Sequence, residues 1–280
     1  MQVTETIGFE YPQEALDIAN SIVGVVDALI PGKTPFGERP LKLVLVDWSS
    51  HGPLVFWDEH AYNAKTYEIW LRSSQPRWRE FVGHLWQKLF RHGYVDPNRP
   101  IYSWRGLAFQ LTHEVAHLKM GPARSNLVLE VLATAVSLET FSGLKKAWQE
   151  SPPTSWNGWS RYAERLPRYR EAIVRLGTKD LPASIRQGFW QLPIEDQELS
   201  LEKTKREIEN SSLLGAKSRA WQMAAAEVLV RRALSRKERW RDLRGIAMRT
   251  DPKASDEPGY RDDLPLPADA FPWWMPEWLR

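Results

Sequence analysis

Apolar residues recur at helical spacing near the start of the chain and at strand spacing after it. Within residues 11–30 they return every three or four positions, which predicts one amphipathic helix. The apolar side of this helix consists of Ala15, Ile18, Ile22, Val25 and Leu29. Apolar runs bounded by turn residues then predict strands at 41–47, 53–57 and 66–71. Helical spacing returns at 77–91, so we expect a small sheet with flanking helices.

Two further segments are predicted to be helices that follow each other closely. The first ends at the helix stop Gly121-Pro122. Its apolar stripe consists of Leu107, Leu111, Val115 and Leu118. The second can begin at Ser125 or Asn126, which are both good N-caps, and is apolar on nearly every side over 127–138. A helix with that composition is expected to be buried.

Beyond residue 142 the pattern predicts helices and no convincing strand. The predicted helices are 167–176, 182–192, 195–209 and 216–248. We therefore expect an α+β region over residues 1–142, an all-helical subdomain over 143–248 and an irregular tail over 249–280. Four aromatic residues of that tail are expected to pack on their own domain, with a partner surface or a plug over the cleft as the alternatives. They are Phe271, Trp273, Trp274 and Trp278.

The chemistry centres on the sequence His113-Glu114-Val115-Ala116-His117. Two histidines four residues apart stand one turn apart on one face of a helix, so both rings can reach the same ion. Glu114 lies beside that face, where a carboxylate can hold and deprotonate a metal-bound water. The competing interpretation is an amphipathic helix whose two histidines are merely polar. The position of the motif on a helix with an apolar stripe favours a metal site.

Glu130 is the predicted third ligand. It lies inside the apolar run 127–138, where an ionised carboxylate without a partner would cost several kcal/mol. A metal held by His113 and His117 would supply that partner. The alternative is a half-exposed Glu favoured by the dipole of the helix N-terminus. Glu139 is a rival ligand, but nine residues are two and a half turns, so it points away from Glu130 and is expected at a polar helix end.

This arrangement resembles the HExxH zinc metallopeptidases called zincins, in the gluzincin branch, over about residues 106–139. The resemblance implies that His113, His117 and Glu130 hold Zn²⁺ and leave a fourth position for water. Glu114 would act as the general base in peptide-bond hydrolysis. The fold implied is a small twisted sheet over the active-site helix. A protein or peptide substrate would then lie as an added strand along a sheet edge, at 66–71.

Two departures limit the resemblance. The zincin branch with a third histidine is excluded, because Met120 and Ala123 stand where its pattern requires Gly and His. Thermolysin-like gluzincins carry an Asp four residues after the ligand Glu, where this chain has Thr134. The residues that orient the zinc histidines must therefore differ here.

The amino-acid composition limits the class of protein and the chemistry that this chain can have. The chain has 280 residues, and its 42% hydrophobic and 26% charged residues are an ordinary globular balance. The absence of cysteine excludes disulfides, thiolate zinc ligands and a cysteine nucleophile. No signal peptide or membrane span is evident in the sequence, so we expect a cytoplasmic protein without a membrane partner. The net charge of +3 does not require a nucleic-acid partner.

Other functions remain open at this point. The chain can be a non-catalytic, metal-stabilised module that binds proteins through its helical half, or a nucleic-acid-associated factor acting through the basic helix 231–249. The sequence does not choose the side chain that would stabilise the reaction oxyanion. The candidates are Tyr94, Tyr102, Tyr162, Tyr169, His51, His60, His84 and His92.

Overall fold

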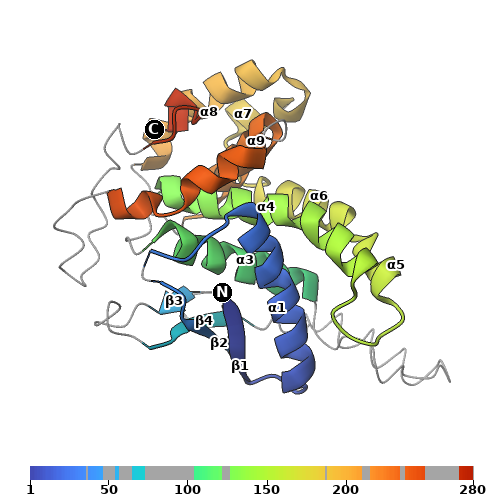
Figure 1. Ribbon diagram of the computed structural model, residues 1–280. Coiled ribbons are helices and arrows are strands. Elements are labelled where there is room, and N and C mark those ends of the chain that lie inside the picture. The colour runs from blue at the N-terminus through green and yellow to red at the C-terminus, as the bar shows by residue number, and fades with distance from the viewer. Residues whose placement is uncertain are drawn as a thin grey trace, which may run out of the picture.

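The computed structural model defines the arrangement of helices and strands (Figure 1). It describes residues 1–35, 37–46, 54–56, 65–72, 104–121, 127–186, 188–209, 215–233, 237–249 and 271–279. The fold is α+β: a small sheet lies below a set of helices, as the sequence predicted (Figure 1). The helix predicted at 77–91 falls outside the described residues.

A four-stranded sheet occupies the N-terminal part of the chain, in the order β1-β2-β4-β3. Strands β1 (Gln2–Ile7), β2 (Pro40–Val46) and β4 (Tyr67–Arg72) run parallel, and β3 (Leu54–Phe56) is antiparallel to β4. Helix α1 (Pro12–Leu29) joins β1 to β2. The strands predicted at 41–47, 53–57 and 66–71 and the helix at 11–30 are confirmed.

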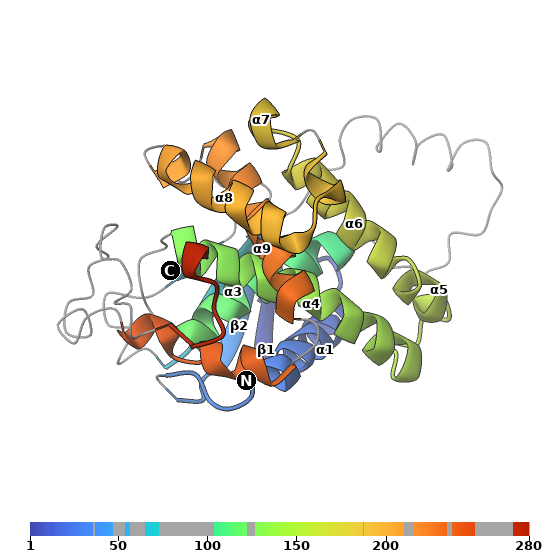
Figure 2. The same ribbon diagram turned by 90° about the horizontal axis from the view of Figure 1, so that it is seen from above.

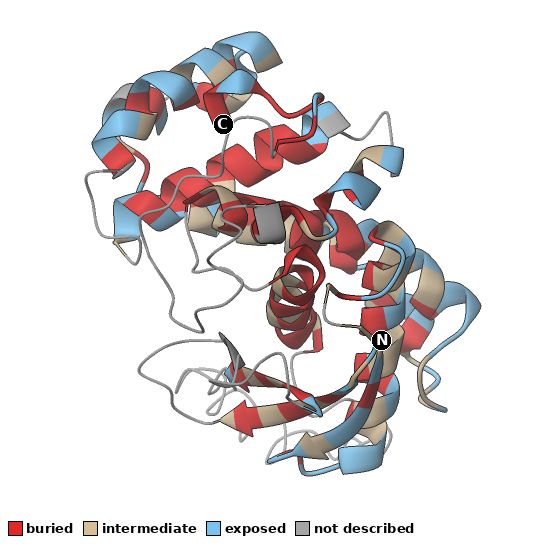
Figure 3. Cartoon of the chain, turned by 60° about the vertical axis from the view of Figure 1, so that its left-hand side comes forward, coloured by how far each residue is buried: buried red, intermediate tan, exposed pale blue. Residues whose placement is uncertain are grey.

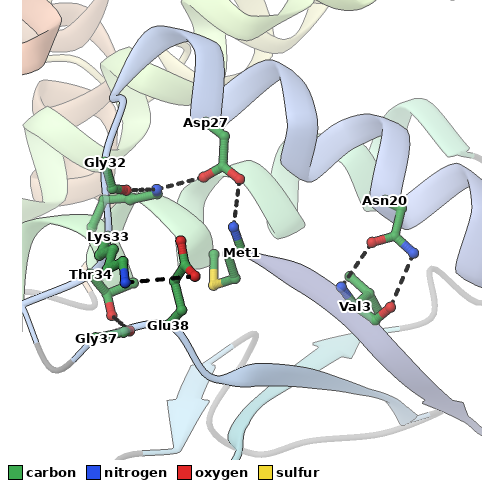
Figure 4. A network of polar contacts seen from close by, with 10 residues as sticks. Met1, Val3, Asn20, Asp27, Gly32, Lys33, Thr34, Gly37 and Glu38 are labelled. Atoms are coloured by element: carbon green, nitrogen blue, oxygen red, sulfur yellow. Dashed lines mark hydrogen bonds and ion pairs between the residues drawn. The ribbon is translucent and has the colours of Figure 1, made fainter.

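Strand β1 was missed because its sequence lacks an apolar alternation. Only Val3 of β1 is buried, so the strand offers little hydrophobic signal. The side chain of Asn20 on α1 holds this strand by hydrogen-bonding both the N–H and the carbonyl of Val3. Its Oδ1 accepts from the Val3 N–H at 2.8 Å, and its Nδ2 donates to the Val3 carbonyl at 3.0 Å (Figure 4).

The predicted role of residues 66–71 as a free sheet edge is wrong. Strand β4 pairs with β2 on one side and with β3 on the other, with Ile69 opposite both Leu43 and Val55. A strand with neighbours on both sides has no unpaired main-chain groups left for a substrate. On this side of the sheet the outermost described strand is β3.

One face of the sheet is buried. Strands β2 and β4 alternate between buried and half-buried positions, as expected for a sheet packed on one side (Figure 3). The buried side chains are Leu41, Leu43, Leu45, Tyr67, Ile69 and Leu71. Helix α1 packs on β1, and α3 (Trp104–Met120) packs on β3 and β4. The HExxH helix is therefore seated directly on the sheet.

Helix α4 (Leu127–Glu150) is the central element of the molecule. It packs against α1, α3, α5 (Trp159–Ala163), α6 (Leu166–Gly177) and α9 (Ala216–Ala233) (Figures 1 and 2). Such an environment explains why its sequence is apolar on nearly every side, and the predicted burial is confirmed. By length and hydropathy it could also cross a membrane, but 78% of that window is buried inside the protein, as in a core helix.

Helix α4 is longer than the sequence predicted, and this corrects the interpretation of Glu139. The helix continues to Glu150, so Glu139 lies in its interior and is only 8% exposed. The expectation of a solvent-facing helix end at Glu139 is wrong. The predicted boundary between residues 142 and 143 also falls inside α4.

The remaining elements are the long helix α8 and several short helices. They are α7 (Ala183–Arg186), η1 (Phe189–Gln191), α8 (Ile194–Glu209), η2 (Lys237–Leu243), η3 (Ile246–Arg249) and η5 (Glu277–Leu279). The helices predicted at 167–176 and 195–209 are confirmed as α6 and α8. The one predicted at 182–192 is instead two short turns with the left-handed Gly188 before η1. The one at 216–248 ends at Ala233 as α9, and 3-10 turns follow from Lys237.

The end of the chain packs on the helical part. Phe271, Trp274 and Trp278 are buried, which confirms the expected docking for these three residues. Trp273 is the exception, with 74% of its surface exposed. The ring of Trp278 meets the ring of Trp221 on α9 edge-on, with centroids 6.2 Å apart.

A buried polar cluster holds the C-terminal end of α3. The Lys119 ammonium, which is 1% exposed, lies 2.5 Å from Asp27 Oδ1 on α1 and donates to the Gly32 carbonyl at 2.6 Å. The second oxygen of Asp27 accepts from the amino group of Met1 at 2.8 Å (Figure 4). These contacts fix α3 against α1 two residues beyond His117.

Candidate metal centre

The two motif histidines face each other on α3. One helical turn separates His113 from His117, and their ring centroids lie 4.9 Å apart. Their Nε2 atoms approach to 3.2 Å. The helix ends four residues later at Gly121, whose φ of 106° is a conformation that favours glycine. The Gly121 N–H donates to the His117 carbonyl at 2.9 Å, so the helix stop is confirmed at this residue.

Glu130 reaches the histidine pair from the neighbouring helix. It lies in the first turn of α4, and its Oε2 is 3.2 Å from His113 Nε2 while its Oε1 is 3.4 Å from His117 Nε2. Within the residues that the structure describes, this is the one group of three side chains of metal-ligating type whose ligand atoms converge, all within 4.8 Å of one another. The folding of α3 against α4 therefore brings together all three side chains that the sequence predicts to be ligands.

The separations fit a tetrahedral ion. Zinc bonds to histidine nitrogen and carboxylate oxygen of about 2.0–2.2 Å, at tetrahedral angles, place the ligand atoms about 3.3–3.5 Å apart. The two Nε2 atoms are 3.2 Å apart, His113 Nε2 lies 3.2 Å from Glu130 Oε2, and His117 Nε2 lies 3.4 Å from the other carboxylate oxygen, Oε1. Two imidazole nitrogens and one carboxylate thus come close to these separations. Two histidines and one carboxylate are a donor set that can hold a zinc ion with a fourth position left for water.

Strong electrostatic coupling marks the cluster. Burial by itself lowers the pKa of His113, but its hydrogen bond to Glu130 and the charges of Glu130 and Glu114 outweigh burial and raise that pKa. Burial also raises the pKa of Glu130, yet the hydrogen bonds and charges of the two histidines bring it well below its usual value. Glu130 is therefore an anion, as a metal-ligating carboxylate must be.

Glu114 and Glu139 occupy different environments. Glu114 follows His113 directly on α3 and is 6% exposed, and its negative charge acts on His113. Glu139 is buried in α4, but nine residues place it about 13 Å along the helix from Glu130 and on the opposite side. It does not belong to the His113–His117–Glu130 group.

Two candidate oxyanion residues lie away from the cluster. The Tyr162 hydroxyl accepts from the Arg105 N–H at 2.9 Å, and the Tyr169 ring lies 4.8 Å below the Arg105 guanidinium. Arg105 is eight residues before His113, roughly 12 Å along the helix axis. Burial raises the pKa of Tyr162 to about 12, consistent with a structural residue. Both tyrosines therefore hold the N-terminal end of α3.

The other candidate oxyanion residues lie outside the described residues. They are Tyr94, Tyr102, His51, His60, His84 and His92. Sequence reasoning overlooked the buried contacts that position the HExxH helix, namely Lys119 at one end and Tyr162 at the other. A lysine between Leu118 and Met120 in an apolar helix turn was a signal that an anion had to lie nearby.

Comparison with known proteins adds no relative. No family model, no curated protein and no solved structure matches the chain. The functional argument therefore rests on the fold and on the geometry of the site.

Proposed function

We propose that this protein is a zinc-dependent metallopeptidase of zincin type. The observation that carries the proposal is the convergence of His113, His117 and Glu130 at separations that suit a tetrahedral zinc ion with one open vertex. The setting supports it, because an HExxH helix packed on a small sheet and followed by a helix with a ligand Glu resembles the gluzincin layout.

Each residue has a defined task in the proposed reaction. His113, His117 and Glu130 would hold Zn²⁺, which supplies an acidified water and polarises a carbonyl when it is bound. The Glu114 carboxylate takes one proton from the attacking water as the oxygen bonds to the scissile carbon. Glu114 then gives that proton to the amide nitrogen, which leaves as the amine when the C–N bond breaks.

Of the two edge strands of the sheet among the described residues, β1 and β3, we assign an extended substrate to β3. Strand β3 pairs with β4 on one side and has no strand partner on its other side among the described residues. It also packs near α3, the helix that carries the motif. A peptide added to β3 would gain main-chain hydrogen bonds while it passes close to the HExxH helix.

The orientation of the zinc histidines would differ from that in thermolysin-like enzymes. Thr134 lies one turn after Glu130 on the same side of α4 and is 6% exposed. A neutral hydroxyl there cannot supply the carboxylate that makes a histidine ligand more basic. We therefore propose a zinc site with less basic histidines than the thermolysin pattern implies.

The nucleic-acid alternative loses support from the structure. Arg231 donates to Glu227 at 3.0 Å, and Arg232 donates to Glu198 at 2.5 Å. Arg239 lies over the rings of two tail tryptophans, and α9 ends at Ala233. The basic stretch is therefore not one continuous helix, and several of its arginines have partners within the chain.

Metal analysis and a peptidase assay test the proposal together. We expect one zinc ion per chain, loss of hydrolysis of a casein substrate on chelation and recovery with zinc. Glu114→Gln should keep the zinc and lose about a hundredfold to ten-thousandfold in rate, because general acid–base catalysis contributes about that much. The matched control is Glu164→Gln, an exposed carboxylate outside the cluster. Native activity in the chelated protein or in Glu114→Gln would refute the proposal, and zinc binding without hydrolysis would indicate the non-catalytic module.

A further inference from the structure

The helical part contains a pocket that the proposed hydrolysis does not use. Its volume is about 560 Å³, and it lies between α8 and the C-terminal segment 273–278. Helix α8 contributes Glu195, Glu198, Leu199 and Glu202. These positions follow the spacing i, i+3, i+4, i+7, so one face of α8 lines the pocket. None of the residues that line it belongs to the His113–His117–Glu130 group.

The charge of this pocket is negative. Four glutamates and two arginines line it, which gives a net charge of −2 (four negative, two positive). Arg232 neutralises Glu198, with its Nη1 2.5 Å from both carboxylate oxygens. Glu195, Glu202 and Glu277 are exposed and have no ion pair within the part of the chain that the structure describes. Three carboxylates thus remain for a cation from outside.

The opposite wall is aromatic. Trp274 is buried and its Nε1 donates to Asp242 at 2.8 Å, which fixes the segment, while the neighbouring Trp273 is 74% exposed. The Arg239 guanidinium lies 5.8 Å from the Trp273 ring and 5.9 Å from the Trp274 ring. These two indoles therefore already contact a guanidinium within the chain, and Trp273 presents an exposed aromatic surface at the pocket.

One residue that lines the pocket carries a buried, unsatisfied donor. Trp278 lines it and is 6% exposed, and its indole N–H has no hydrogen-bond acceptor among the described residues. A buried N–H without an acceptor costs about 1–3 kcal/mol relative to a paired one.

We propose that this pocket is a docking site for a basic peptide segment of a partner protein. An arginine or lysine side chain of the partner lies against Trp273, close to the carboxylates of Glu195, Glu202 and Glu277. Its apolar stem covers Leu199, which is 47% exposed. The inference goes beyond the proposed hydrolysis and does not depend on it, because the two sites share no residue.

The test uses two labelled octapeptides. One alternates arginine with glycine, and the other carries neutral citrulline in place of each arginine. Binding to the full chain is measured by fluorescence anisotropy at two salt concentrations. We expect saturable binding of the arginine peptide, weakened by salt, and binding of the citrulline peptide that is at least about tenfold weaker.

Two variants locate the binding. Trp273→Ala and the triple variant E195Q/E202Q/E277Q should each weaken binding of the arginine peptide by about tenfold or more. Both change exposed side chains, so the fold should persist, and circular dichroism verifies that it does. The matched control E164Q/E171Q/E207Q removes the same charge from exposed carboxylates outside the pocket and should change binding by less than about twofold.

The possible outcomes separate clearly. Loss of binding in both pocket variants with retention in the control supports the docking site. An equal loss in the control variant would mean that binding follows overall charge, and it would overturn the proposal. Absence of saturable binding to the native chain, or equal binding of the citrulline peptide, would overturn it as well.

Discussion

The α3–α4 pair and the helical C-terminal part are both well packed, but they use polar groups in opposite ways. In the α3–α4 pair, charged side chains lie inside an apolar environment and contact one another, as His113, His117 and Glu130 do. In the C-terminal part, aromatic rings such as those of Trp221 and Trp278 are buried, and three of the four glutamates that line the pocket beside α8 are exposed. Buried charge is costly unless it is paired, so the first arrangement satisfies its charges within the fold, whereas the second leaves its carboxylates to solvent.

The positioning of α3 reinforces this contrast. Its C-terminal end is held by the ion pair of Lys119 with Asp27, and its N-terminal end by the hydrogen bond from Arg105 to Tyr162. A close approach of α1 to α4 adds rigidity, because a Cβ at Gly143 would lie 2.5 Å from Val25 Cγ1. The contacts at both ends of α3 therefore hold His113 and His117 in place relative to the neighbouring helices.

The largest expected effect distinguishes Glu130 from Glu139, two glutamates of α4. Glu130→Ala should lower zinc affinity by more than about a hundredfold, since it removes a ligand and leaves the two histidines less constrained. Glu139→Ala should leave zinc affinity nearly unchanged and affect only stability, because Glu139 is buried away from the cluster. Titration of both variants against a competing chelator measures this. The assignment fails if the larger loss occurs in Glu139→Ala.

The next effect concerns how the C-terminal part is held together. Trp278→Ala should lower the free energy of unfolding by about 3–5 kcal/mol, because it removes a buried ring that contacts Trp221. Trp273→Ala should change it by less than about 0.5 kcal/mol, since that ring is exposed. Urea unfolding followed by circular dichroism gives both values. Equal effects would show that the end of the chain does not pack as described.

The sequence predicts features that depend on nearby residues better than features that depend on contacts between distant segments. The two histidines and Glu130 were predictable because helix periodicity fixes which residues share a face and because a lone carboxylate in an apolar run needs a cation. Glu139 was misplaced because the end of α4 had to be guessed, and burial depends on the surrounding helices rather than on α4 itself. Strand β1 and the central position of β4 depend on pairing between distant segments, which local alternation does not encode.

The pocket beside α8 could not be predicted from the sequence, again because it depends on contact between distant segments. Glu195, Glu198 and Glu202 were visible as one helix face, but a solvated face and a pocket wall have identical spacing. Only the approach of segment 273–278, about 70 residues away in sequence, turns that face into a cavity. The aromatic composition of the tail indicated packing, yet it did not show that Trp273 alone would stay exposed.

A smaller effect is expected at Lys119, which contacts α1 from the C-terminal end of the HExxH helix. Lys119→Met should destabilise the protein by about 3 kcal/mol, because it breaks a buried ion pair and leaves Asp27 with one partner fewer. Lys33→Met removes a lysine 3.9 Å from Glu38, where both side chains are about two-thirds exposed, and should cost less than about 0.5 kcal/mol. Urea unfolding compares the two variants. If Lys119→Met is as stable as Lys33→Met, α3 is not held by this contact.

The smallest expected effect is the pH dependence of the zinc-free protein. The pKa of His113 is raised above its unfolded value, so its contribution to stability is present in full below about pH 6.5 and is lost as pH rises through the folded pKa. The pKa of Glu130 is lowered, so its contribution is present above about pH 4.5 and is lost as pH falls. The pair therefore stabilises the chelated protein most between these two values.

Zinc should compete with the proton on His113, so a saturating amount should move the maximum of stability to higher pH. Melting temperatures measured from pH 4 to 8 with chelator and with zinc test this, with Glu150→Gln, an exposed site on the same helix, as the control. An identical profile with and without zinc would show that the ion does not bind through His113.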